Sequence, residues 1–137
     1  MKNDKPFSFR ERLQSFPHAF RGLATFFKIE HNARIHLGMG ILAILISFWL
    51  KISGNQFCIV VLTIAMVWAA EALNTVLEIL VNMVSPNYSD AAKLAKDVGA
   101  AAVLIASMAA VVVGAIILLP LFIERVSSLF ASSGFVR

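Results

Sequence analysis

The sequence has the length of one domain and the composition of a membrane protein. Of its 137 residues, 59% are hydrophobic and 15% are charged, and the mean hydropathy is +0.82, whereas a soluble domain is about 45–50% apolar and about 25% charged. The formal net charge of +4 suits anionic lipid headgroups, and with so much apolar sequence we expect no nucleic acid partner.

The first predicted element is a basic amphipathic helix over residues 7–28. Phe16, Phe20, Leu23 and Phe27 recur at i, i+4, i+7 and i+11, so they share one helical face. Arg and Lys residues in the same segment supply positive charge. This pattern is typical of a helix that lies in the membrane surface. A helix packed on the soluble side of the protein is the alternative.

Three longer apolar segments follow, and each can cross a bilayer core, which requires about 20 residues. The predicted spans cover residues 29–51, 52–84 and 98–123, with a cytoplasmic loop over residues 85–97 and a tail over residues 124–137. Within the loop, Ser89 is expected to cap a short helix that contains Asp90 and Lys93. We therefore expect an all-α integral membrane protein, with residues 1–137 forming a single domain of three transmembrane helices and an amphipathic surface helix.

The distribution of basic residues predicts the orientation of these spans. Seven Lys and Arg residues precede Ile35, where the apolar run of the first span begins, and Lys93 and Lys96 lie in the predicted loop. Only three basic residues fall on the opposite side. Because short cytoplasmic segments carry an excess of Lys and Arg, the N-terminus and the loop are expected to be cytoplasmic.

The second predicted span carries polar residues on a single face. Glu71, Asn74, Thr75, Glu78 and Asn82 recur at i, i+3, i+4, i+7 and i+11, which places them within about a third of the helix circumference. A carboxylate at membrane depth costs about 2.5–3.5 kcal/mol on insertion scales and is usually functional. A helix-packing seam explains Asn74 and Thr75 alone, but two glutamates and two amides on one face favour a functional site.

Counting residues along the helices places the charged groups in one layer. At about 1.5 Å per residue, Glu71 lies roughly 28 Å from Ile52, near the cytoplasmic edge of a core about 30 Å thick. By the same count, Glu30 lies about 31 Å from Lys51. Lys96 and Asp97 stand at the start of the third predicted span. In such a layer, a water-soluble reactant can meet a lipid headgroup.

Carboxylates, amides and a lysine at a membrane boundary suit phosphoryl transfer. Mg²⁺ prefers one or two carboxylates together with phosphate oxygens, a lysine can neutralise phosphate charge, and a carboxylate can accept the proton of an attacking hydroxyl. The sequence has no GxxxxGK[ST] or GxGxxG motif, so a nucleotide would be held by another scaffold. From these residues alone, a kinase and an ion-coupled carrier both remain open.

Three segments, in order along the chain, carry a resemblance to a known family. Residues 71–78, EALNTVLE, are similar to the motif E-x-x-N-[ST]-x-x-E, and residues 95–103, AKDVGAAAV, are similar to A-K-D-x-[GA]-[SAG]-A-A-V. Residues 30–36, EHNARIH, are similar to E-x-N-x-[RQ]-I-H. Over roughly residues 20–120 the chain resembles the prokaryotic diacylglycerol kinases, a family that includes the undecaprenol kinases. The 30–36 segment is similar to the version found in the undecaprenol kinase branch.

The resemblance implies a lipid kinase of the bacterial cytoplasmic membrane that uses ATP and Mg²⁺. Its substrate would be diacylglycerol or undecaprenol, and the 30–36 segment tilts the choice mildly to undecaprenol. Position by position, the match implies a catalytic base at Glu71, metal ligands at Glu30 and Glu78, ATP-binding residues Glu30, Glu78, Asn87, Tyr88, Ser89, Lys96 and Asp97, and lipid or site-support residues Arg34, Asn74, Asn82 and Ala100. The family also implies a homotrimer with active sites shared between protomers. Ala106, Ala110 and Gly114 form a small-residue ridge that independently favours close helix packing.

The sequence departs from the family pattern on the nucleotide side. Asn82 stands where the family usually has Asp, and Asn87 and Ser89 stand where relatives usually have Glu and His. These changes predict weaker nucleotide binding, and a non-catalytic scaffold is the alternative to an active kinase. The proposed base and both metal carboxylates are kept, which favours an active enzyme. His36 lacks the spacing of a metal site and is interpreted as an interfacial side chain.

Overall fold

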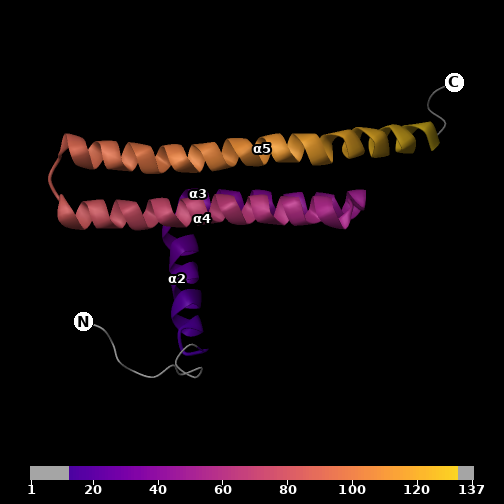
Figure 1. The fold of residues 1–137 in the computed structure, drawn as a ribbon. Coiled ribbons are helices and arrows are strands. Elements are labelled where there is room, and N and C mark those ends of the chain that lie inside the picture. The colour runs from indigo at the N-terminus through magenta and orange to yellow at the C-terminus, as the bar shows by residue number, and fades with distance from the viewer. Residues whose placement is uncertain (1–12, 133–137) are drawn as a thin grey trace.

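The computed structural model describes residues 13–132, and these residues fold into helices alone. The helices are α2 (Phe16–Ile29), α3 (His31–Leu50), α4 (Gly54–Val84) and α5 (Asp90–Ser132). In Figure 1, α4 and α5 run antiparallel side by side, α3 lies along α4, and α2 runs crosswise to all three. Helices α3, α4 and α5 are each long and apolar enough to cross a membrane. The predicted fold class is therefore confirmed.

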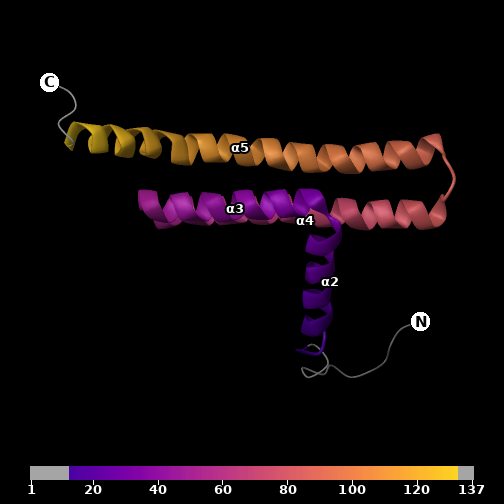
Figure 2. The same ribbon diagram turned by 180° about the vertical axis from the view of Figure 1, so that it is seen from behind.

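The three long helices differ in length, so the longer ones extend past the others at the two ends of the bundle. Helix α3 has 20 residues, about 30 Å, which matches the hydrocarbon core of a bilayer. Helix α4 has 31 residues and α5 has 43, about 46 and 64 Å. Figures 1 and 2 show the α4–α5 connection extending past α2 at one end and α5 extending past α3 at the other. The connection therefore lies on the same side of the bundle as α2.

Local capping explains the tight turn between α3 and α4. Lys51 ends α3 in the left-handed conformation, with φ 54° and ψ 45°, a common way for a helix to stop. The Ser53 hydroxyl oxygen accepts a hydrogen bond from the Gln56 backbone N–H, and the Gln56 side chain accepts one from the Ser53 backbone N–H. This capping box satisfies two N–H groups at the helix start. Helix α4 therefore begins at Gly54, two residues after the predicted start.

The predicted loop over residues 85–97 is too long, because α5 already begins at Asp90. The Ser89 hydroxyl accepts a hydrogen bond from the Ala92 N–H at 3.4 Å, so the predicted cap is confirmed. Between Asp90 and Asp97 there is no Gly or Pro, and the alanines favour helix. The short helix predicted after Ser89 and the third predicted span are therefore one continuous helix.

The predicted tail also differs, since residues 124–132 continue α5 as helix. The helix passes through Pro120, which lacks an N–H and commonly breaks helices in water. In membrane helices proline is tolerated more readily. Residues 133–137 of the predicted tail lie outside the described residues.

Helix α2 attaches to the bundle through aromatic side chains. Phe26 is buried. The rings of Phe27 and Trp68 pack edge-to-face, with their centroids 5.5 Å apart. Phe16, Phe20 and Leu23, from the predicted apolar face, are exposed. The helix thus presents an uncovered apolar face, as expected of a surface helix. Residues 7–12 of the predicted helix lie outside the described residues.

Small side chains set the spacing between α3 and α4. Gly40 is buried, and a Cβ added there would lie 3.1 Å from Cγ2 of Ile64 on α4. A Cβ added at Gly38, two residues earlier, would meet nothing within 4 Å. Gly40 therefore marks the close contact between the two helices, whereas Gly38 lies on an open face.

We predict that Gly40→Val destabilises the bundle and that Gly38→Val does not. Overpacking a tight site typically costs about 1–3 kcal/mol, whereas a substitution on an open face is usually within about 0.5 kcal/mol. Thermal unfolding of the two variants in the same detergent measures the difference. Equal stability of the two variants would contradict the assigned α3–α4 contact.

Candidate active site

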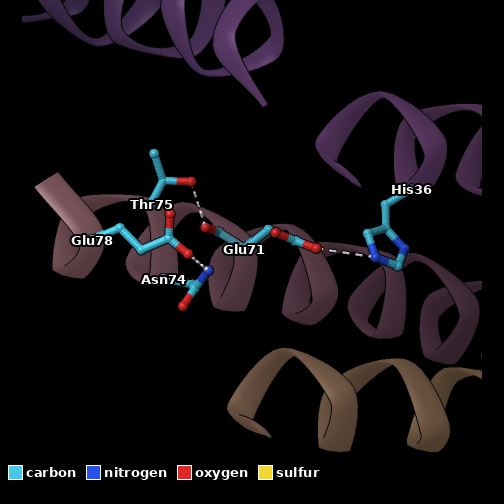
Figure 3. Close-up of polar contacts among 5 residues, drawn as sticks. All are labelled: His36, Glu71, Asn74, Thr75 and Glu78. Atoms are coloured by element: carbon cyan, nitrogen blue, oxygen red, sulfur yellow. Dashed lines mark hydrogen bonds and ion pairs between the residues drawn. The ribbon is translucent and has the colours of Figure 1, made fainter. Parts of the chain in front are cut away.

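The centre of the site is a carboxylate buried inside a membrane-spanning helix. Glu71 on α4 is only 2% exposed, and its Oε1 lies 3.2 Å from Nε2 of His36 on α3. Figure 3 shows His36 reaching towards Glu71 from the neighbouring helix. The two atoms are close enough for an ion pair, but they are not aligned as a hydrogen bond. Among the described residues, Oε1 of Glu71 has no hydrogen-bond partner. Glu71 therefore retains an acceptor atom for a ligand.

The next turn of α4 continues the polar face predicted from the sequence. The Thr75 hydroxyl donates to the backbone carbonyl oxygen of Glu71 at 3.0 Å, and both residues are buried. The Asn74 side-chain N–H donates to Oε1 of Glu78 at 3.1 Å, as Figure 3 also shows. Thr75 is thus satisfied within its own helix. Asn74 instead orients the Glu78 carboxylate.

A glycine on α5 makes room for this arrangement. Gly99 is buried, and a Cβ added there would lie 2.5 Å from Oδ1 of Asn74. That distance is shorter than any real Cβ contact, so an alanine would displace the Asn74 side chain. The same Oδ1 atom is buried without a hydrogen-bond partner among the described residues. The close approach of α4 and α5 therefore fixes the position of Asn74, and through it that of Glu78.

Glu30 reaches the site from the bend between α2 and α3. Its backbone is extended, with φ −97° and ψ 117°, and its side chain makes no capping hydrogen bond to α3. Glu30 and Glu78 are both half-buried, whereas Glu71 is almost fully buried. All three predicted carboxylates are thus at least partly shielded from solvent by the helices. Arg34 and Ala100, predicted to support the site, are exposed.

A second polar region surrounds the connection between α4 and α5. A pocket of about 320 Å³ there is lined by the six predicted residues Asn82, Asn87, Tyr88, Ser89, Lys96 and Asp97, among others. The Lys96 ammonium donates to Oδ1 of Asn82 at 2.7 Å. Asn82 lies one turn beyond Glu78, about 6 Å along α4. The pocket therefore adjoins the carboxylates on the side that extends past α2.

Asn82, the main departure from the family pattern, has a defined contact in the structure. Its amide oxygen holds Lys96 across the α4–α5 interface. An amide accepts this hydrogen bond without neutralising the ammonium charge. Asn82 therefore holds the Lys96 ammonium at the edge of the pocket without supplying a counter-charge.

The donor set suits Mg²⁺ only in combination with phosphate oxygens. Across residues 13–132 the structure shows no group of three His, Cys, Asp or Glu side chains placed to hold a metal ion. Glu30 and Glu78 offer carboxylate oxygens, which Mg²⁺ prefers, and Mg²⁺ commonly binds through one or two carboxylates plus substrate phosphates. The residues present thus fit a metal ion that arrives with a nucleotide.

His36 is a site residue that the sequence analysis missed. Its assignment as an interfacial side chain overlooks the contact with Glu71 at 3.2 Å. The distances of the two residues from the turn between their helices could have indicated the contact. His36 lies about 22 Å along α3 from Lys51, and Glu71 lies about 28 Å along α4 from Ile52. The two residues are therefore about one helical turn apart in depth. The sequence could indicate this shared layer but not which faces of α3 and α4 meet.

The small-residue ridge on α5 has a different neighbour from the one expected. Ala106 is buried within the chain, and Ala110 and Gly114 line an apolar cavity between α3, α4 and α5. The ridge therefore faces the other helices of the same chain. It provides no separate argument for contact between protomers.

Comparison with known proteins identifies the family of the chain. The family model described as prokaryotic diacylglycerol kinase matches residues 17–118. A diacylglycerol kinase from Synechocystis sp. is 39% identical over 109 residues, 79% of this chain, and the chain spans only 62% of that relative's length. An undecaprenol kinase from Bacillus subtilis is 30% identical over 107 residues, 78% of this chain and 87% of that protein. The resemblance seen in the sequence is confirmed, and the chain belongs to the prokaryotic diacylglycerol kinase family.

Proposed function

We propose that the protein is a membrane lipid kinase that transfers the γ-phosphate of ATP to the hydroxyl of a lipid alcohol. The observation that carries the proposal is the position of Glu71. It is buried beside His36, which lines the apolar cavity, and the polar pocket at the α4–α5 connection begins about three turns further along α4. A lipid hydroxyl and a nucleotide phosphate can meet between these two regions.

On the lipid side, Glu71 acts as the general base. Its carboxylate accepts the proton of the lipid hydroxyl as the oxygen attacks the γ-phosphate, a role that requires hydrogen-bond reach between the two groups. The bond from the γ-phosphorus to the bridging β-phosphate oxygen breaks, and ADP leaves with that oxygen. An Nε2–H of His36 would donate towards the carboxylate and keep it oriented. Because the surrounding helices bury the carboxylate, it has no hydration shell to lose before it accepts the proton.

On the nucleotide side, the residues further along α4 and at the start of α5 bind the phosphates. Lys96 offsets phosphate charge, while Asn87, Tyr88, Ser89 and Asp97 contact the rest of the nucleotide. Glu30 and Glu78 would hold Mg²⁺, which when bound neutralises charge that develops on the phosphates. Asn74 positions the Glu78 carboxylate through its hydrogen bond.

We further propose the placement of the chain in the bacterial cytoplasmic membrane. Lys and Arg residues concentrate before α3 and near the α4–α5 connection, which favours a cytoplasmic N-terminus and connection. This orientation presents the polar pocket to cytosolic ATP. A homotrimer with shared sites follows from family resemblance, and it is consistent with the large exposed apolar surfaces of the long helices.

The proposed activity predicts Mg²⁺-dependent transfer of labelled phosphate from ATP to lipid. Purified protein in mixed micelles, offered diacylglycerol and undecaprenol separately, should yield a phosphorylated product from at least one of them. Omission of Mg²⁺ should abolish transfer, because ATP phosphates require a counter-ion in the transition state. The Bacillus subtilis relative serves as the positive control. No product from either lipid, under conditions where that relative is active, would support a non-catalytic scaffold instead.

The two glutamates on α4 should respond differently to loss of charge. They are about 10.5 Å apart along the axis, too far for one small group to engage both. Glu71→Gln should lower turnover by about 100-fold or more while ATP still binds. Glu78→Gln should weaken Mg–ATP binding, with turnover partly restored at high Mg²⁺. Nucleotide titrations and initial rates measure both effects.

A matched control for this pair is Glu124→Gln, because Glu124 is an exposed carboxylate at the opposite end of α5. It should change neither turnover nor nucleotide binding. If Glu71→Gln lost ATP binding while Glu78→Gln bound it normally, the two roles would be reversed.

The two lysines of the polar pocket offer a further prediction. Lys96 is held by Asn82, whereas Lys93, which lines the same pocket, is exposed. Hydrogen bonds to charged groups contribute about 1.5–3 kcal/mol, so Lys96→Met should weaken ATP binding by about tenfold or more. Lys93→Met should have a smaller effect. Equal losses in isothermal titration would show that general positive charge, rather than the position of Lys96, binds the nucleotide.

A further inference from the structure

Helix α5 extends past the rest of the bundle at the end opposite α2. The match to the family model ends at residue 118, whereas α5 continues as helix to Ser132. Figures 1 and 2 show this end of α5 extending past α3. Residues 119–132, the α5 extension, are therefore not accounted for by the features that the family shares.

The α5 extension begins at the level where the turn between α3 and α4 lies. A Cβ added at Gly99 would touch Asn74, so these two residues lie at one level of the antiparallel helices. Asn74 is 20 residues from the first residue of α4, about 30 Å, and the same count along α5 leads from Gly99 to Leu119. The rings of Phe122 and Trp49, which lies near the end of α3, are 5.9 Å apart between centroids. Because α3 has the length of the hydrocarbon core, the helix that follows Phe122 reaches about 15 Å past the edge of that core.

This extension is amphipathic. Its five polar residues all lie on one side, and the two that are charged, Glu124 and Arg125, have opposite signs. At 100° per residue, the opposite third of the circumference carries only apolar side chains, which are those of Leu119, Phe122, Ile123, Val126, Leu129 and Phe130. All of these except Val126 are exposed in the structure. If the helix continued straight out of the membrane, this apolar face would stand in water.

The width and the position of the apolar face favour a lipid surface over a second copy of the chain. A face that covers a third of the circumference is broader than the narrow seam of a coiled coil. The face also continues an apolar stripe of the spanning part of α5, because Val112, Ile116, Leu119 and Ile123 recur at i, i+4, i+7 and i+11 and are each more than half exposed. The extension thus presents the same side that the span turns away from α3 and α4.

Pro120 supplies the bend that contact with a lipid surface requires. It lies inside α5, at the level where the bundle ends. Because proline has no N–H, the helix lacks the hydrogen bond to the carbonyl oxygen of Ile116, and sharp bends in helices occur mostly at proline. A bend towards the exposed stripe turns the apolar face of the extension down onto the bilayer.

We propose that α5 bends at Pro120 and that the α5 extension lies in the headgroup region of the membrane face opposite α2, with Ile123 and Phe130 directed towards the acyl chains. Amphipathic helices bind bilayers in this way, with the apolar face buried by about 5–10 Å. Because the charges of Glu124 and Arg125 cancel, a neutral lipid surface is sufficient. Together with α2, the extension would anchor the bundle at both membrane surfaces. The proposal does not depend on the kinase chemistry, since none of these residues belongs to the proposed site.

Spin-label accessibility of the full chain in phosphatidylcholine nanodiscs tests the proposal. In a Cys58→Ser background, which removes the single cysteine, one label at a time is attached to Ile123→Cys, Glu124→Cys, Phe130→Cys or Ala131→Cys. Neighbouring positions differ by 100° in direction but only about 1.5 Å along the axis, so each is the matched control of the other. The ratio of oxygen to nickel-complex accessibility should be about threefold or more higher at positions 123 and 130 than at 124 and 131. Positions 123 and 130 should also lie at equal depth.

Two results would overturn the proposal. Labels that are all open to the nickel complex, and more so at 130 and 131 than at 123 and 124, would show a straight helix in water. Labels at 123 and 130 that are shielded from both reagents and broadened by spin–spin coupling would show contact with a second copy. If labels on the apolar face unfold the extension, those at Glu124 and Ala131 still decide, because a straight helix separates them by about 10 Å in height and a surface helix holds them at one depth.

Discussion

The arrangement of the site depends on the burial of the Glu71 carboxylate against His36. An ionisable group in a membrane-spanning helix is expensive unless it has a partner, and Glu71 is almost fully buried. His36 supplies that partner from α3 at 3.2 Å. The contact requires α3 and α4 to meet at one particular level, and the two helices also approach closely at Gly40. The pair therefore couples the packing of the bundle to the chemistry of the site.

A second constraint comes from the contact between α4 and α5. Gly99 leaves space for Asn74, and Asn74 donates to Glu78. A turn further along, Asn82 accepts from Lys96. These contacts hold the charged residues of two antiparallel helices in register. The Asn74–Glu78 contact lies within α4, and the Asn82–Lys96 contact crosses to α5. Because an amide is one partner in each, neither contact neutralises a charge that phosphate or metal binding would use.

The site thus separates an apolar region from a polar one, with Glu71 between them. The cavity beyond His36 is almost entirely hydrocarbon in its lining, whereas the pocket at the α4–α5 connection contains lysines, amides and hydroxyls. A lipid alcohol and a nucleotide require these two environments. The continuity of α4 through both regions explains how a small membrane protein can present them side by side.

The sequence by itself determined that the chain is helical, how many of its helices are candidate membrane spans, and which residues form the polar face of α4. Hydrophobic length and the helical repeat are local properties, so Glu71, Asn74, Thr75 and Glu78 could be placed on one face without a structure. Only the tertiary structure decided that His36 contacts Glu71 and that the ridge at Ala110 faces inward. These features depend on the rotation and register of one helix against another. Periodicity fixes the angle of a residue within its own helix but carries no information about the face that the neighbouring helix presents.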